Sequence, residues 1–158
     1  MAFDAMEQRR IMGHFATGVT VITTCHDDVL HGMTANAVTS LSLDPPLVLV
    51  AVDLRSQMLE LLKQEKCFAM NILDGEQEAI SSRFAAPGPK DFSALDIETA
   101  VTGAPILAAA LAFVDCRLSE ILHGGDHDIF IGEIVNGEDR GEDGGRPLLY
   151  FGGYARLR

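Results

Sequence analysis

The sequence is poor in basic residues, poor in cysteine and free of long hydrophobic runs. Of its 158 residues, 12 are Lys or Arg and 23 are Asp or Glu, which gives a formal net charge of −11 at pH 7. Nucleic-acid backbones and anionic lipid surfaces attract Lys and Arg, so this charge argues against both as main partners. Small molecules and other proteins remain as candidate ligands.

The three cysteines, Cys25, Cys67 and Cys116, are odd in number and have no CxxC or other metal-ligand spacing. We expect them to be reduced, with Cys67 and Cys116 buried as small hydrophobic side chains. The longest strongly apolar run, residues 47–52, is far shorter than the roughly 20 residues that cross a bilayer. Residues 1–10 contain acids and no apolar core typical of a secretory signal, so we expect a cytoplasmic protein without a membrane partner.

Several common motifs are absent as well. The chain has no GxGxxG, GxxxxGK[ST], GxSxG or HExxH, which excludes a Rossmann fingerprint, a P-loop, a hydrolase nucleophile elbow and a zinc-protease helix. Any nucleotide must therefore be held in another way. His123 and His127 are four residues apart, but the glycines between them, Gly124 and Gly125, predict a turn between strands and no metal site.

The patterns that are present predict one α+β domain, mainly β, over residues 1–158. Helical periodicity indicates helices over residues 5–16, 56–66 and 75–84. Strand-like stretches cover residues 19–24, 31–42, 47–53, 67–73, 111–122, 128–135 and 148–157. About six or seven strands with two or three peripheral helices, without βαβ alternation, favour a barrel over a doubly wound sheet.

Hydroxyl and amide side chains gather on a strand pair that should otherwise be apolar. They are Thr34, Asn36, Thr39, Ser40 and Ser42. Burying such a group without a hydrogen-bond partner costs about 1 to 3 kcal/mol. Each can pair with neighbouring backbone or face water at a sheet edge, but their clustering before the rigid Asp-Pro-Pro at residues 44–46 favours a bound ligand.

Four segments together resemble the flavin reductase family, the FMN-binding split barrels that serve as reductase components of two-component monooxygenases. They are FATGVTVITT at 15–24, GMTANA at 32–37, SLSLDPPL at 40–47 and GDH at 125–127. The likeness extends over residues 10–154. It implies a six-stranded Greek-key split β-barrel, usually a homodimer, that binds FMN or FAD. It also implies oxidation of NADH or NADPH and release of reduced flavin to a partner monooxygenase.

The resemblance implies groups of site residues, ordered here by the part of the cofactor that they face. The isoalloxazine ring would lie along Met33, Thr34, Ala35 and Asn36. The ribityl chain and phosphate would lie near Ser40, Leu41, Asp53 and Ser56. Further phosphate and ring contacts would come from Arg83, Phe84 and Lys90. The nicotinamide would lie beside His127, the expected catalytic residue, and Tyr154 would border either the isoalloxazine ring or the nicotinamide pocket. The sequence departs from the commonest form at Ala37 and Asp53, where many relatives carry serine and asparagine.

A strongly acidic chain that holds a phosphate must place its few cations locally. The candidates are Arg55, Arg83 and Lys90, and the acids should gather elsewhere, notably at residues 138–143. No Arg or Lys cluster accompanies the GDH turn, which favours NADH over NADPH because a 2′-phosphate normally requires a cation.

Other functions remain open on the sequence alone. One alternative is a flavin-dependent reductase of another acceptor, such as the cobalt of cob(II)yrinic acid diamide. Another is a non-enzymatic split barrel that binds flavin or haem for storage, sensing or electron transfer. A third is a barrel that binds no nucleotide and acts by dimerisation alone.

Overall fold

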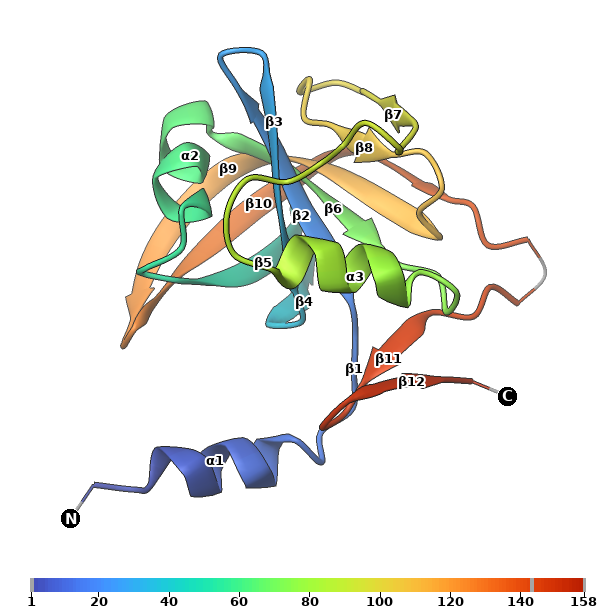
Figure 1. Cartoon of the computed structure of the whole chain (residues 1–158). Helices are drawn as coiled ribbons and strands as arrows, with labels where there is room; N and C mark the ends of the chain where they lie inside the picture. The colour runs from blue at the N-terminus through green and yellow to red at the C-terminus, as the bar shows by residue number, and fades with distance from the viewer. Residues whose placement is uncertain (1, 143, 158) are drawn as a thin grey trace.

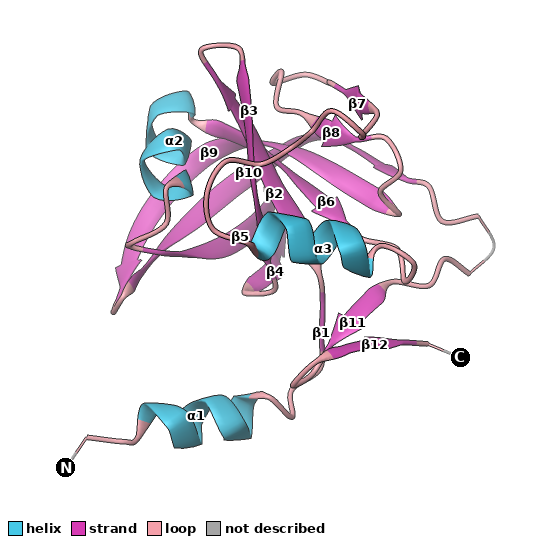
Figure 2. Ribbon diagram, in the orientation of Figure 1, coloured by secondary structure: helices cyan, strands magenta, loops and turns pink. Residues whose placement is uncertain are grey.

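The computed structural model describes residues 2–142 and 144–157, in which three helices accompany twelve strands (Figures 1 and 2). The helices are α1 (Ala5–Met12), α2 (Met58–Glu65) and α3 (Glu78–Ala85). The strands are β1 (Thr17–Gly18), β2 (Thr20–His26), β3 (Val29–Ala35), β4 (Val38–Leu43), β5 (Pro46–Asp53), β6 (Cys67–Ile72), β7 (Ile97–Glu98), β8 (Ile106–Leu107), β9 (Ala112–Gly124), β10 (His127–Asp139), β11 (Leu148–Tyr150) and β12 (Tyr154–Arg156). None of the helices in these ranges has the length and apolar character that a bilayer span requires.

The main sheet has seven strands in the order β3-β2-β6-β9-β10-β5-β4, with antiparallel neighbours throughout. β3 and β4 are consecutive in the chain but stand at opposite edges of this sheet. The step from Ala35 to Val38 spans at most about 11 Å, so the two edges must come close together. The sheet therefore curls into an open barrel, which confirms the predicted mainly β α+β fold.

One predicted strand, residues 31–42, is two strands in the structure. Ala35 at the end of β3 pairs with Thr20 of β2, whereas Val38 at the start of β4 pairs with Val50 of β5. The chain changes partner at Asn36 and Ala37, and the main sheet consequently has seven strands where the resemblance implied six.

Alternating side chains fill the barrel. Val48, Val50 and Val52 of β5 point inward and are buried, while the residues between them are partly exposed, as the period of two in a strand requires. They join the buried rings of Phe68 and Phe130 in one apolar cluster. α2 packs its buried side chains against the same cluster and so closes one end of the barrel.

A second apolar cluster lies between the barrel and α3. Phe84 of α3 is buried against Val21 and Leu148, and Tyr154 packs at its border. Phe92, from the loop after α3, lies edge-to-face on Phe84 with ring centroids 5.1 Å apart. This contact gives the loop a fixed course across the molecule (Figure 1).

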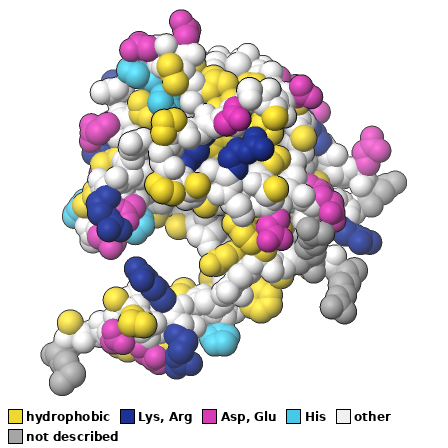
Figure 3. Space-filling model, viewed as in Figure 1, with side chains coloured by type: hydrophobic (Ala, Val, Ile, Leu, Met, Phe, Trp, Pro, Cys, Tyr) yellow, Lys and Arg dark blue, Asp and Glu magenta, His cyan; other side chains and the backbone are white. Residues whose placement is uncertain are grey.

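α1 stands apart from the barrel and has no buried residue (Figures 1 and 3). Asp4 caps its start by accepting the N–H of Met6 at 3.2 Å. The helix ends at Met12, earlier than the predicted residue 16, and Gly13 caps it by donating its backbone N–H to the carbonyl oxygen of Arg9. Phe15, just beyond it, is 68% exposed.

β1, β11 and β12 form a small sheet between α1 and the barrel (Figure 2). The predicted strand over residues 148–157 is here a hairpin, because Tyr150 pairs with Tyr154 across a short turn. This turn brings both tyrosine rings together, edge to face, with centroids 5.5 Å apart.

All three cysteines are free thiols. Cys116 is fully buried, as its strand pattern predicts. Cys67, for which the same pattern predicts burial, is only half-buried because it begins β6 at the end of the barrel.

Candidate functional site

A cavity of about 940 Å³ opens where β3, the end of β5, α2 and α3 meet. This volume lies within the range of roughly 300 to 1,000 Å³ typical of small-molecule sites. The walls are β3 with the two residues after it, the segment from Asp53 to Met58, the end of α3 with its loop to Lys90, and three separate side chains: His127, Tyr150 and Tyr154. Segments far apart in the sequence therefore build one site.

β3 faces the cavity with an open backbone edge. It pairs with β2 on one side, and on the other side it has no strand partner among the described residues. Met33, Thr34, Ala35 and Asn36, the predicted ring contacts, all line the cavity. Unpaired N–H and C=O groups along this edge can form hydrogen bonds to the rim of a flat heteroaromatic ring.

The polar side chains on β3 have different tasks. Thr34 donates its hydroxyl hydrogen to the carbonyl oxygen of Ser81 at 2.6 Å, so this group ties β3 to α3. The Asn36 side chain is exposed and has no hydrogen-bond partner in the described part of the chain. Its amide is thus available to a ligand, whereas the Thr34 hydroxyl already has an acceptor.

α3 forms the opposite wall and places Tyr154 there. The hydroxyl oxygen of Tyr154 lies 2.8 Å from Oγ of Ser81, a fully buried residue of α3. Phe84, one turn further along, also lines the cavity. Phe84 and Tyr154, both predicted site residues, therefore line the cavity, and the hydrogen bond to Ser81 explains how a C-terminal residue reaches it.

The N-terminus of α2 opens into the cavity. Ser56 Oγ accepts the N–H of Met58 at 3.2 Å, and Ser56, Gln57 and Met58 all line the cavity. The first turn of a helix has N–H groups without intrahelical acceptors and a partial positive charge. This end of the cavity therefore favours an anionic group such as a phosphate.

The three predicted cations behave differently. Lys90 lines the cavity, and its ammonium donates to the Ala86 carbonyl oxygen. Arg55 also lines it, but Nε and Nη2 bind the carboxylate of Asp53 at 3.1 and 2.8 Å. Arg83 lies outside the lining and donates to the Asp91 carbonyl oxygen at 3.3 Å. Among the described residues, Lys90 is the lining cation without a carboxylate partner.

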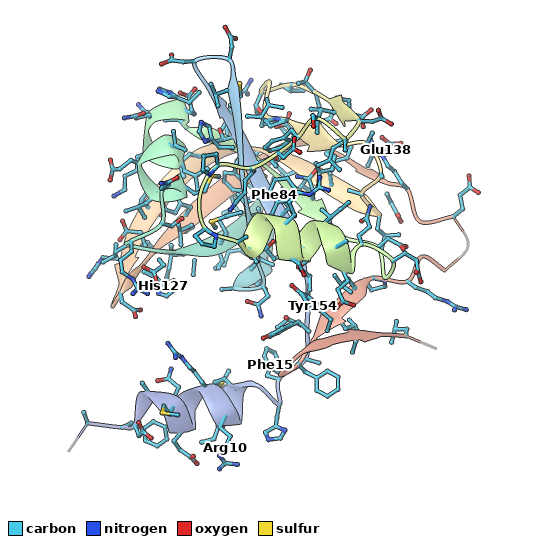
Figure 4. All side chains as sticks on the ribbon, viewed as in Figure 1. Arg10, Phe15, Phe84, His127, Glu138 and Tyr154 are labelled. Carbon is cyan, nitrogen blue, oxygen red and sulfur yellow. The ribbon has the colours of Figure 1, made fainter. Side chains whose placement is uncertain are left out.

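Asp53 lies between Arg55 and His127, the expected catalytic residue. The Arg55 guanidinium and backbone N–H hold the pKa of the Asp53 carboxyl far below its usual range. Its cross-strand partner is His127, the first residue of β10, which lines the cavity. Figure 4 shows His127 on the β9–β10 hairpin at the edge of the molecule.

The two histidines of the hairpin have different partners. His127 Nδ1 lies 2.7 Å from an oxygen of Asp126. His123 Nδ1 lies 3.1 Å from an oxygen of Asp128, which also binds Lys63 Nζ at 3.1 Å. His123 thus takes part in an ion-paired contact with α2, while His127 remains at the cavity.

Other predicted site residues are not gathered by the fold of one chain. Ser40 and Leu41 lie on β4 with exposed side chains, outside the cavity lining, because the chain has already crossed to the other sheet edge. The acidic segment 138–142 is also outside the lining, and Figure 4 shows Glu138 on the far side of the molecule from His127. Asp143 lies outside the described residues.

Some lining residues have no signal in the sequence. They are apolar or conformational residues contributed by the β2–β3 hairpin, α2 and the loop after α3: Val29, Leu30, Leu61, Pro87, Gly88 and Pro89. Tyr150 also lines the cavity. In the sequence, the one signal for it is the predicted site residue Tyr154, which is its partner in the hairpin. Tertiary contacts alone bring these residues to the site.

Known proteins resemble this chain over nearly its whole length. Residues 12–158 match the model of the family described as the flavin reductase like domain. The reductase component of 4-nitrophenol 4-monooxygenase/4-nitrocatechol 2-monooxygenase from Rhodococcus opacus is 39% identical over 150 residues, which cover 95% of this chain and 79% of that protein. The structure of the flavin reductase PheA2 in its native state matches with a TM-score of 0.89 at 41% identity, over 99% of both chains. The NADH:FAD oxidoreductase SgcE6 of Streptomyces globisporus, solved in complex with NAD and FAD fragments, matches with a TM-score of 0.91 at 36% identity, over 98% of this chain and 93% of that one.

Proposed function

Because the chain belongs to the flavin reductase family, we propose that it is an NADH-dependent flavin reductase that supplies reduced FMN or FAD to a partner monooxygenase. The observation that carries this proposal is one cavity lined both by the open edge of β3 and by His127. Hydride transfer requires the flavin and nicotinamide rings to meet face to face. In this cavity the open edge of β3 can bind one flat ring, and the separate side chain of His127 can contact the other.

The described residues fit a flavin. The open edge of β3 supplies N–H and C=O groups for the ring, and the free amide of Asn36 adds a side-chain donor and acceptor. The first turn of α2 and the ammonium of Lys90 provide positive charge for the phosphate. The partly exposed ring of Tyr154 offers an aromatic surface against which a ring can pack, and the buried ring of Phe84 supports the same wall from the core.

The cofactor supplies the redox chemistry, because a bound flavin accepts the hydride that leaves C4 of the nicotinamide. The chain itself binds the two rings, orients them and limits the access of water. We assign His127 to the nicotinamide side, where its imidazole orients the carboxamide or the pyrophosphate. Ser40, Leu41 and Arg83 lie outside this cavity, so any flavin contact from them requires a second chain or a moved loop.

Flavin-dependent NADH consumption tests the proposal. Purified protein should quench FMN fluorescence at micromolar concentration and oxidise NADH when FMN or FAD is added in excess. His127→Ala should lower the rate, whereas a binding protein without activity would consume no NADH. Rapid reduction of a cobalt corrin with weak turnover of added flavins would favour the alternative acceptor.

Transfer of reduced flavin to a monooxygenase predicts that the flavin is released. The reductase can be separated from ferricytochrome c by a dialysis membrane that NADH and flavin cross and the proteins do not. Reduction of the cytochrome in the far compartment, dependent on added FMN under anaerobic conditions, supports a diffusible product. Reduction that occurs only when the protein and the cytochrome are mixed argues for tightly held flavin.

We also propose a homodimer located in the cytoplasm, where NADH is produced. α1 has no buried residue, and apolar side chains are exposed on and around it, with Met6 76% and Phe15 68% exposed (Figure 3). Leu43 on the edge strand β4 is 90% exposed. Light scattering should give twice the 17.0 kDa of one chain, and deletion of residues 2–13 should weaken the dimer. A wild-type monomer at micromolar concentration would contradict this, and cell fractionation tests the location.

A further inference from the structure

The β9–β10 hairpin closes in a two-residue loop, because Gly124 pairs with His127 and only Gly125 and Asp126 lie between them. Gly125 has a φ of +68°, which matches the glycine-first pattern of a type II′ turn. The carbonyl oxygen of Asp126 accepts the N–H of Leu54 at 3.0 Å. The backbone of Asp126 is therefore held by the hairpin on one side and by the end of β5 on the other.

The side chain of Asp126 lies against one ring nitrogen of His127. Oδ1 of Asp126 lies 2.7 Å from Nδ1 of His127. An ionised carboxylate can only accept a hydrogen bond, so Nδ1 must be the donor. In the neutral imidazole, Nε2 then carries a lone pair and is an acceptor. Nε2 has no hydrogen-bond partner among the described residues.

The other charged groups around His127 already have partners. Asp53, its cross-strand neighbour, binds Arg55 through both carboxylate oxygens. Asp128, the next residue on β10, binds Lys63 and His123. Asp126 is thus the carboxylate that contacts the ring.

We propose that Asp126 is a positioning residue that fixes the tautomer of His127, so that Nε2 accepts a hydrogen bond from the carboxamide NH₂ of the nicotinamide. This inference rests on the proposed function, because it needs NADH in the cavity. It adds a direction to the contact: the histidine accepts and the carboxamide donates. The hydrogen bond orients the nicotinamide and takes no part in the hydride transfer.

A thermodynamic cycle with two dinucleotides tests the inference. The variants are Asp126→Ala, His127→Ala, the double variant and a charge-matched control, Glu120→Ala, on the exposed part of the same hairpin. Each is assayed with excess FMN, using NADH and reduced 3-acetylpyridine adenine dinucleotide, in which a methyl ketone replaces the carboxamide and a methyl group therefore stands in place of the NH₂. Dividing the kinetic constants of each variant by those of the wild type with the same dinucleotide removes the intrinsic difference in hydride donation between the two dinucleotides.

Asp126→Ala should raise KM for NADH about threefold to tenfold, the value of one ordinary hydrogen bond, with little change in kcat. It should leave KM for the acetylpyridine compound unchanged and have no further effect in the His127→Ala background. Asp126→Glu, which keeps the carboxylate, should recover part of the loss. Glu120→Ala should behave as the wild type.

Two results would overturn the inference while the proposed function stands. One is a wild-type KM for NADH in Asp126→Ala. The other is an equal rise in KM for both dinucleotides or in both backgrounds, which is the signature of a damaged hairpin. Normal FMN fluorescence quenching by each variant shows that the fold is intact. If the wild type itself oxidises no NADH, the proposed function fails first.

Discussion

The ring of Phe84 rests directly on the backbone of Gly32: a Cβ placed on Gly32 would lie 2.7 Å from Cε1 of Phe84. Both residues line the cavity, as do Thr34 and Ser81, whose hydrogen bond ties the same two elements together. The width of the cavity between β3 and α3 therefore depends on the absence of a side chain at one position.

Gly32→Ala should destabilise the protein and widen the site. The new methyl group displaces a buried aromatic ring, and overpacking of this kind costs typically about 1 to 3 kcal/mol. Urea unfolding should show the loss, and FMN titration should show weaker binding because α3 moves away from β3. Gly18→Ala is the control, since no atom lies within 4 Å of its Cβ position. Equal unfolding midpoints for Gly32→Ala and the wild type would contradict the packing argument.

Lys90→Gln should weaken binding of FMN more than binding of riboflavin, which lacks the phosphate. Lys90 is the lining cation without a carboxylate partner among the described residues, so the phosphate should gain most from it. We expect the FMN dissociation constant to rise about threefold to tenfold, with a smaller dependence on salt than in the wild type. Arg117→Gln, an exposed cation outside the lining, controls for net charge. An equal loss for riboflavin would show that Lys90 acts through the loop and not the phosphate.

Asp53→Asn should lower stability at neutral pH and lose this effect in acid. Arg55 holds the folded-state pKa of the Asp53 carboxyl well below its unfolded value, which is about 3.9. Such a group stabilises the native state above the unfolded pKa and ceases to do so as pH falls through the folded pKa. The difference between the urea midpoints of variant and wild type should therefore be constant above about pH 4 and shrink progressively as the pH falls below it. Glu120→Gln serves as the control, and a difference that stays constant in acid would contradict the ion-pair assignment.

Cys116 should be unreactive in the native protein. Burial raises the pKa of its thiol to about 12, so almost no thiolate forms at neutral pH. Alkylation followed by mass spectrometry should modify the half-buried Cys25 first and leave Cys116 free until urea unfolds the chain. Labelling of both cysteines at one rate would mean that β9 opens readily.

Local patterns predicted much of the fold because their causes are local. The alternation along residues 47–53 becomes β5, the apolar run at 67–73 becomes β6, and the periodicity after Ser56 becomes α2. The patterns failed where the chain changes partner. The stretch 31–42 has the composition of one strand, yet Asn36 and Ala37 carry it from one sheet edge to the other, and no local residue preference encodes that crossing.

The candidate site likewise combines residues that the sequence indicated with residues whose direction only the fold sets. The segment 33–36, Ser56 and His127, which the resemblance assigns to the site, all line the cavity. Arg83 is on α3 next to Phe84, but the helix turns its side chain toward Asp91. A one-residue step along a helix changes the direction of a side chain by about 100°. Only the docking of α3 on Gly32 decides which of these two neighbours faces the ligand.

The sequence by itself determined the class of fold and the acidic charge that leaves few cations for an anionic ligand, because composition and periodicity are properties of the chain alone, and its motifs carried the family likeness. Tertiary structure decided which charges remain available. Arg55 is held by Asp53 two residues away, His127 by its neighbour Asp126, and Lys90 by no carboxylate in the described residues. The physical reason is that an ion pair depends on side-chain direction and distance, which strand register and helix docking set after the chain has folded.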